Sequence, residues 1–298
     1  MGDTCLRKLL LGLCMIALSG CQDLPSGATG RHVAAQRGES PTGGTPHQGS
    51  LKVVSLNLAH GRGNALNQLL LDRDDFEANL GRVAEWLLAL DADVVALQEA
   101  DGPSRWSGGF DHVAALAQAA AYPWYERAGH AQSWLFDYGT ALLSRQPFSE
   151  VLNHTFAPSP PTLNKGLLLG QIAWRLPGGG RPLRVDILSV HLDFSRQKTR
   201  RRQIEELVAV LAGRENPGII LGDFNSDWFS KASTVRALAE RAGLQVYAPD
   251  ARDLGTYRDG SKRLDWILIS KELEFLDYRV VADRVSDHRA VYAEIGFR

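Results

Sequence analysis

The sequence predicts one α/β domain in which packed β-sheets are covered by helices. From residue 51 onward, short apolar runs of strand length interleave with longer segments whose apolar residues recur at helical spacing. Several of the expected strands follow one another without an intervening helix, which favours packed sheets over a simple strand–helix alternation. No internal repeat and no interdomain linker occurs after residue 50, so residues 51–298 are expected to form a single domain.

Eight strands and three helices are expected in this domain. The strands are apolar runs at residues 51–58, 93–97, 140–144, 167–174, 183–190, 218–221, 264–269 and 290–295. The helices cover residues 74–90, 199–211 and 231–242. The first helix is the clearest, because its apolar residues share one helical face: Phe76, Leu80, Val83, Leu87 and Leu90.

The composition is that of a globular protein, with 44% hydrophobic and 22% charged residues. The formal net charge is −1, whereas proteins that bind nucleic acid without sequence preference usually carry a basic excess. The only cysteines are Cys5, Cys14 and Cys21. The predicted domain therefore has no thiol nucleophile, disulfide or cysteine metal ligand, and its chemistry must come from carboxylates, histidines and hydroxyls.

The first twenty residues have the features of an export signal. Arg7 and Lys8 precede an apolar run, Leu9 to Leu18, which is too short to span a bilayer. The run ends in Leu18-Ser19-Gly20-Cys21, which resembles the lipobox of bacterial lipoproteins, where the cysteine is lipidated and becomes the mature N-terminus. The alternatives are an ordinary signal peptide with a chance cysteine, or a short buried helix.

Residues 22–50 are rich in Gly, Pro, Ser and Thr, and they offer too few apolar side chains to offset the entropy of ordering. We expect a signal peptide at residues 1–20, a flexible tether at 21–50 that starts at the lipidated Cys21, and the domain at 51–298. Gln22 follows the cysteine, and by resemblance to enterobacterial sorting this favours the outer membrane, facing the periplasm or the exterior.

Replacing Cys21 with serine is expected to release the protein from membranes, because several acyl chains give stable anchoring and the serine variant would carry none. Fractionation of cells into membrane and soluble protein measures the effect. An unchanged membrane fraction would contradict lipidation.

Polar side chains gather at the ends of the expected strands, where catalytic groups are commonly held by a rigid sheet. They are Asn57, Glu99, His191, Asp223, Asn225, Asp265, Asp287 and His288. The oxygen donors among them suit Mg²⁺, Mn²⁺ or Ca²⁺ better than zinc, and two histidines can carry protons near neutral pH. This combination indicates metal-assisted attack of water on a phosphoryl group.

Seven short stretches follow one another in an order that resembles the endonuclease/exonuclease/phosphatase superfamily over the whole of residues 51–298. They are SLNL (Ser55 to Leu58), LQE (Leu97 to Glu99), YGTALLSR (Tyr138 to Arg145), SVHLD (Ser189 to Asp193), GDFN (Gly222 to Asn225), RLDWI (Arg263 to Ile267) and SDHRAV (Ser286 to Val291). Each is a weak pattern alone, and their common order makes the signal specific. The resemblance implies the deoxyribonuclease-like fold, a four-layer α/β sandwich of two packed mixed β-sheets flanked by helices.

The resemblance implies that Glu99 is the principal metal ligand, assisted by Asn57 and Asp287. The expected ion is Mg²⁺ or Mn²⁺, with Ca²⁺ as a third candidate. The alternative for Asn57 is to cap a turn, which is common for asparagine at a strand end.

The resemblance also implies the catalytic roles. Asp223 would orient or deprotonate the attacking water, and Asn225 would hydrogen-bond the phosphate or the water. His288, oriented by Asp265, would contact the phosphate and carry a proton. His191 would contact a non-bridging oxygen or protonate the leaving group, and which histidine is the acid and which the base stays open.

Neighbouring residues are less specific. Asp193 is expected to hydrogen-bond locally and is left out of the site, and Tyr138 is either a core or rim residue or a phosphate contact. The basic cluster at residues 196–202 is either a phosphate-steering rim or, as we favour, a solvated helix start. Trp228 and Phe229 follow GDFN closely and are candidates for a wall of the site.

His191 narrows the choice within the family, because abasic-site repair endonucleases of this fold usually carry asparagine there. The resemblance implies a nuclease-like phosphodiesterase or other phosphoric ester hydrolase, monomeric, acting on nucleic acid or on phospholipid headgroups. The alternatives are a sphingomyelinase-like phospholipase C, an inositol-phosphate phosphatase, or a catalytically silent binding lipoprotein.

Overall fold

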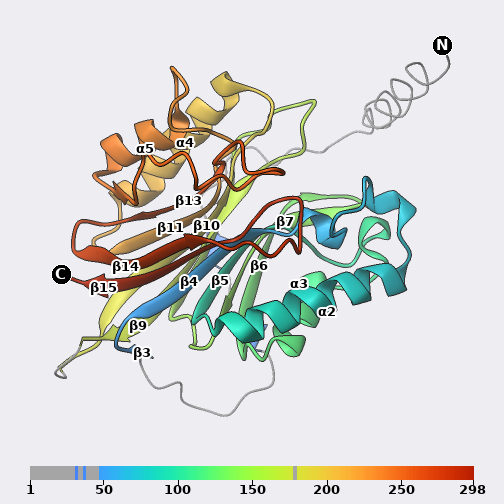
Figure 1. Ribbon diagram of the computed structural model, residues 1–298, viewed down its shortest axis with the longest axis horizontal. Helices are drawn as coiled ribbons and strands as arrows, with labels where there is room; N and C mark the ends of the chain where they lie inside the picture. The colour runs from blue at the N-terminus through green and yellow to red at the C-terminus, as the bar shows by residue number, and fades with distance from the viewer. Residues whose placement is uncertain (1–30, 33–35, 38–46, 177–179) are drawn as a thin grey trace.

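Two β-sheets stack face to face, and helices cover their outer faces (Figure 1). This computed structural model describes residues 31–32, 36–37, 47–176 and 180–298. The expected signal peptide, Cys21 and most of the expected tether lie outside the described residues. The arrangement confirms the four-layer α/β sandwich of two mixed sheets that the sequence predicts.

The first sheet holds eight of the described strands and the second holds seven. In spatial order the first contains β1 (Arg31–His32), β8 (Glu150–Thr155), β9 (Gly166–Arg175), β10 (Leu183–His191), β11 (Gly218–Asp223), β13 (Asp265–Ile269) and β12 (Gln245–Val246), with β3 (His47–Gln48) beside β9. The second contains β14 (Leu273–Val280), β15 (Val291–Phe297), β4 (Leu51–Asn57), β5 (Val94–Asp101), β7 (Asp137–Ser144), β6 (Trp124–Gln132) and β2 (Gln36–Arg37).

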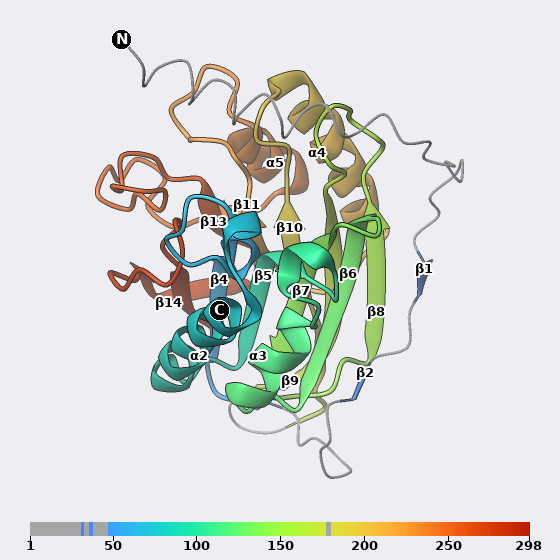
Figure 2. The same cartoon turned by 90° about the vertical axis from the view of Figure 1, so that its right-hand side faces the viewer.

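The helices lie on opposite sides of the paired sheets (Figures 1 and 2). The first sheet is covered by α4 (Gln197–Ala212) and α5 (Thr234–Ala242). The second sheet is covered by α2 (Arg73–Leu90) and α3 (His112–Ala119). Single turns of 3₁₀ helix occur at Ala59–Gly61, Gln68–Leu70 and Arg105–Ser107. In the described ranges, no helix is both long enough and apolar enough to cross a membrane.

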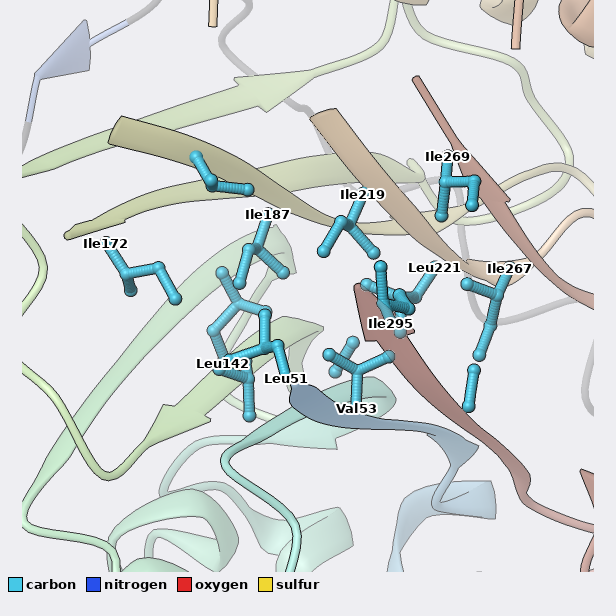
Figure 3. Packing of buried hydrophobic residues seen from close by; sticks show 14 of the residues in the cluster. Leu51, Val53, Leu142, Ile172, Ile187, Ile219, Leu221, Ile267, Ile269 and Ile295 are labelled. Carbon is cyan, nitrogen blue, oxygen red and sulfur yellow. The ribbon is translucent and has the colours of Figure 1, made fainter. Parts of the chain in front are cut away.

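Aliphatic side chains from both sheets fill the space between them (Figure 3). Strand β4 shows how the layers form: Val53 points into this inter-sheet core, and Val54 packs with the residues beneath α2 and α3. Because the central strands bury both faces, they read as continuous apolar runs rather than as alternating ones. This is why the sequence indicated them so clearly.

The strands that carry the predicted site residues end at the same edge of the sandwich. Strands β4 and β5 are parallel, as are β10 and β11, and in the latter pair His191 lies opposite Asp223. Two buried side chains join the sheets near this edge: Gln98 Nε2 donates to Ser189 Oγ at 3.1 Å, and Ser189 Oγ donates to the Leu97 carbonyl at 2.8 Å. The sheet ends are therefore held in fixed register with each other.

All eight expected strands and all three expected helices are present, with small shifts at their ends. The third helix begins at Thr234 rather than Lys231, because the Ser233 side chain accepts a hydrogen bond from the Arg236 amide and caps it there. The sequence did not predict α3, β6, β8 or β14.

Candidate active site

The eight side chains predicted for the site meet at one edge of the sandwich. Hydrogen bonds or close contacts join Asn57, Glu99, His191, Asp223, Asn225, Asp265 and His288, and Asp287 directly precedes His288. They come from both sheets. Asn57 and Glu99 belong to the second sheet, whereas His191, Asp223 and Asp265 belong to the first.

Asp223 is the centre of this group and is almost fully buried. Its Oδ2 accepts a hydrogen bond from Asn57 Nδ2 at 3.1 Å and lies 3.6 Å from His191 Nε2 and 3.9 Å from His288 Nε2. Its Oδ1 accepts from the Asn225 amide at 2.9 Å. Burial raises the pKa of Asp223 to about 7, with a further increase from Asp265 on the neighbouring strand. The carboxyl can therefore exchange a proton near neutral pH.

His288 and Asp265 form a buried acid–base pair. His288 Nδ1 lies 2.8 Å from Asp265 Oδ2, and Asp265 Oδ1 is buried with no hydrogen-bond partner among the described residues. Burial alone would lower the pKa of His288, but Asp265 and then Asp223 reverse the effect and raise it to about 10. The ring is consequently an imidazolium at neutral pH, with Nε2 directed toward Asp223.

His191 has the opposite electrostatic environment. Burial and the nearby Lys165 ammonium hold the pKa of His191 well below its usual range, although Glu99 opposes the decrease. Its Nε2 lies between Glu99 Oε1 at 4.0 Å and Asp223 Oδ2 at 3.6 Å. The site thus contains one neutral and one charged imidazole.

Glu99 occupies a bulge of β5, and its backbone adopts a left-handed conformation with φ of 49°. Its Oε2 lies 3.4 Å from His60 Nε2, and the side chain is 21% exposed. Burial would raise the pKa of Glu99, but His60, Lys165 and His191 together lower it to about 2. Glu99 is therefore a partly open carboxylate at neutral pH, as a metal ligand must be.

The other two predicted metal ligands already have protein partners. Asn57 Oδ1 accepts a hydrogen bond from the Ala59 amide at 2.9 Å, so Asn57 caps the following turn as well as contacting Asp223. Asp287 Oδ2 lies 2.5 Å from an Arg62 nitrogen. Both side chains retain acceptor capacity for a cation, because each oxygen carries two lone pairs.

Asp223, Asp265 and His288, which are described above, form a second group that could hold a metal ion. Their ligand atoms lie within 4.8 Å of one another. In this group His288 Nδ1 is already engaged by Asp265. Asn57, Glu99 and Asp287 offer the oxygen donors that hard divalent cations prefer, so both groups are candidates to hold a cation.

Sequence reasoning assigned no role to His60, Asp101, Arg62 or Lys165, which surround the predicted residues. His60 Nδ1 lies 3.0 Å from the fully buried Asp101 Oδ1, while its other nitrogen faces Glu99. His60 and Arg62 lie three and five residues after Asn57. That proximity in the chain is the signal that could have revealed them.

Backbone strain concentrates around the site. His60, Glu99 and Asn225 have φ values of 58°, 49° and 48°, which non-glycine residues seldom adopt. Such conformations are retained where the surrounding structure fixes them, and they commonly occur at functional sites. At Gly222, just before Asp223, a Cβ atom would lie 1.9 Å from the Val190 carbonyl oxygen, so this position excludes any other residue.

Asp193, two arginines of the basic cluster and the aromatic pair after GDFN have partners outside the group of eight. Asp193 Oδ1 accepts hydrogen bonds from Ser195 and from the Arg196 amide, which confirms its local role. Arg196 and Arg202 of the basic cluster bind carbonyl groups of residues 157–160, which supports a structural role for those two. Trp228 and Phe229 line a cavity of about 250 Å³ together with Arg252. The residues that line this cavity do not include any of the eight predicted site residues.

Residues 54–288 match the sequence model of the Endonuclease/Exonuclease/phosphatase family. No curated protein sequence matches the chain.

Several solved structures share its fold. An endonuclease/exonuclease/phosphatase family protein from Leptotrichia buccalis is 20% identical in sequence to this chain, with a TM-score of 0.64. The match covers 83% of this chain and 100% of that protein's chain. The mannosyl-6-phosphatase Bt3783 of Bacteroides thetaiotaomicron is 20% identical with a TM-score of 0.61, covering 83% and 100%. The human Nocturnin catalytic domain with bound sulfate is 17% identical with a TM-score of 0.61, covering 84% and 95%.

Proposed function

Because this chain belongs to the endonuclease/exonuclease/phosphatase family, whose hydrolases act on phosphoesters, we propose that it is a divalent-metal-dependent hydrolase that directs water at phosphorus. The observation that carries the proposal is the position of Asp223. Its carboxylate lies within 3.9 Å of a neutral and a charged imidazole, His191 and His288, beside the oxygen donors of the second sheet.

In the proposed reaction, Asp223 takes the proton of the attacking water. Its raised pKa suits a base that works near neutral pH, and hydrogen bonds from Asn57 and the Asn225 amide hold it in one orientation. Asn225 Nδ2 donates to the Leu192 carbonyl at 3.0 Å, which leaves its side-chain oxygen for the water or the substrate.

His288 supplies positive charge. Because Asp265 keeps it protonated and oriented, its Nε2–H can stabilise negative charge that develops on the phosphoryl oxygens. The neutral His191 is placed to accept a hydrogen bond from a protonated group or to donate to a non-bridging oxygen. This arrangement favours His288 as the charged, proton-carrying histidine of the pair.

Glu99, with Asn57 and Asp287, would hold the divalent cation, Mg²⁺ or Mn²⁺. When bound, the cation would withdraw electron density from the phosphoryl oxygens and lower the barrier to attack. An Arg62 guanidinium nitrogen lies 2.5 Å from Asp287 Oδ2. Arg62 and the cation would therefore share this carboxylate.

Two of the fold relatives support a phosphoester or a similar oxyanion as the ligand. One is described as a mannosyl-6-phosphatase and another carries a bound sulfate anion. We propose a phosphodiester as the substrate, with nucleic acid and phospholipid headgroups as the leading classes. The lipid anchor at Cys21 and the cell-envelope location are part of the same proposal, and there the enzyme would act as a monomer outside the cytoplasm.

The full chain, loaded with Mg²⁺ or Mn²⁺, is expected to hydrolyse bis-p-nitrophenyl phosphate and to release nitrophenol at a rate proportional to enzyme. A panel that also contains plasmid DNA, sphingomyelin and inositol phosphates would identify the substrate class. If the folded, metal-loaded protein hydrolyses none of these compounds, the proposal is wrong and a binding role takes its place.

A further inference from the structure

His60 is a partly buried histidine to which the proposed reaction gives no role. Its side chain is 14% exposed, and each of its ring nitrogens faces a carboxylate. Nδ1 lies 3.0 Å from Oδ1 and 3.2 Å from Oδ2 of Asp101, which is fully buried. Nε2 lies 3.4 Å from Glu99 Oε2. His60 therefore stands between a buried carboxylate and the main carboxylate of the proposed metal site.

The backbone fixes the place of this ring. Ala59, His60 and Gly61 have φ values of 49°, 58° and 69°, so three successive residues are left-handed. Such a conformation persists only where the surrounding structure determines it. Here the Gly61 carbonyl accepts a hydrogen bond from Asn79 Nδ2 at 3.1 Å, and a Cβ atom at Gly61 would lie 2.9 Å from the His112 ring. The turn that carries His60 is thus packed against α2 and α3.

Two aromatic rings and two charges restrict the orientation of the imidazole. Its centroid lies 5.7 Å from that of Trp106 and 5.4 Å from that of Tyr138. Burial alone would lower the pKa of His60, but the carboxylates of Asp101 and Glu99 raise it above its ordinary value. The ring therefore offers an N–H to each carboxylate, and the protein itself sets its direction.

This contact makes the two oxygens of Glu99 unequal. Oε2 lies beside the His60 ring, whereas Oε1 lies 4.0 Å from His191 Nε2, which in turn lies 3.6 Å from Asp223 Oδ2. A cation at the centre of the site would therefore meet Oε1. A cation that took both oxygens would have to displace His60 from Oε2.

We propose that His60, held by Asp101, is a positioning residue that restricts Glu99 to one metal-facing oxygen and thereby favours Mg²⁺ over Ca²⁺. The inference rests on the proposed function, because it requires Glu99 to hold the cation. Residues that contact a metal ligand orient it and tune the ion that it binds. Mg²⁺ demands six ligands in near-octahedral geometry, whereas the larger Ca²⁺ takes six to eight oxygens and readily accepts both oxygens of one carboxylate.

The test is the ratio of the Ca²⁺ to the Mg²⁺ dissociation constant, measured by isothermal titration of the full chain without substrate. His60→Asn keeps a donor near the position of Nδ1 and has none near the position of Nε2. Asparagine also tolerates the left-handed backbone. We expect the ratio to fall on the order of 10-fold. Loss of the imidazolium charge affects two divalent ions alike, so the ratio reports the geometry of Glu99.

Two variants should keep the native ratio. His60→Gln restores a donor near the position of Nε2, beside Glu99. His154→Asn is the matched control, because His154 Nε2 lies 3.0 Å from Glu206 Oε2 and the two side chains are 12% and 24% exposed. The corresponding values for His60 and Glu99 are 14% and 21%.

An unchanged ratio in His60→Asn would overturn the inference. An equal fall in His60→Gln would also overturn it, because the loss would then not depend on the contact with Glu99. If His60→Asn does not fold, Asp101→Asn decides in its place, since it removes the charge that holds Nδ1. The ratio should fall in that variant too, and a native ratio there would overturn the inference.

The failure of this inference can be told apart from the failure of the proposed function. A chain whose ion selectivity depends on His60 but which hydrolyses no phosphoester would overturn the function and leave the inference standing. A metal-dependent phosphoesterase that keeps its native ratio in His60→Asn would overturn the inference and leave the function standing.

Discussion

Asp223→Asn is expected to lower kcat on the order of 10²- to 10⁴-fold while the fold stays intact. The amide has nearly the shape of the carboxyl and can still accept the hydrogen bond that Asn57 donates. The amide cannot take a proton from water. The substitution also removes the negative charge of the carboxylate, whose Oδ2 lies 3.6 Å from His191 Nε2 and 3.9 Å from His288 Nε2. Steady-state kinetics on bis-p-nitrophenyl phosphate measures the effect.

Asp186→Asn is the matched control for this variant. Asp186 is as buried as Asp223, but it lies at the other end of the parallel β10–β11 pair, where it forms an ion pair with Arg214 at 2.7 Å. Removing one partner of a buried ion pair costs about 3 kcal/mol of unfolding free energy. Asp186→Asn should therefore lose stability and keep kcat. Near-native kcat in Asp223→Asn would show that another group acts as the base.

Glu99→Gln is expected to abolish the response to divalent metal as well as the activity. Glu99 is the partly exposed carboxylate whose low pKa keeps it charged, and the amide carries no charge to hold a cation. EDTA should inactivate the native chain, and Mg²⁺ or Mn²⁺ should restore it. Added metal should also raise the melting temperature of the native chain, because a ligand that binds only the folded state stabilises it.

The melting temperature makes this test independent of turnover. Glu99→Gln should show little or no increase with Mg²⁺, whereas Glu77→Gln should respond as the native chain does. Glu77 is an exposed residue of α2 that pairs with Arg73, and such surface pairs contribute little to stability. An unchanged metal response in Glu99→Gln would assign the cation to other residues, with Asp223, Asp265 and His288 the next group to test.

The layered fold could be predicted because the central strands are apolar on both faces. Strand β6 was missed because its exposure alternates and it carries Glu126, Arg127 and His130, which read as a polar segment. His130 is buried between Thr140 and Thr155, and burial lowers its pKa to about 3. Tertiary partners of this kind cannot be read from local sequence.

The eight site residues could be placed because each stands at the end of an apolar run within an ordered motif. Lys165 could not, because nothing in Leu163-Asn164-Lys165-Gly166 indicates that this lysine is buried. Its position depends on the β9–β10 register and on the Tyr138 ring from the other sheet. The left-handed backbone conformation of Glu99 and Asn225 could not be predicted from the sequence either, because neither residue type adopts this conformation as freely as glycine does.

The hydrogen bonds that join Gln98, Ser189 and the Leu97 carbonyl cross from one sheet to the other directly beneath the site. Each sheet contributes only part of the chemistry, with the oxygen donors Asn57 and Glu99 on one and Asp223, Asp265 and His191 on the other. A folding intermediate with both sheets formed but undocked would have native secondary structure and no assembled catalytic centre. The complete set of side chains therefore exists only where the two sheets are docked in this register, so a change that shifts one sheet against the other should disturb the site even if every strand remains intact.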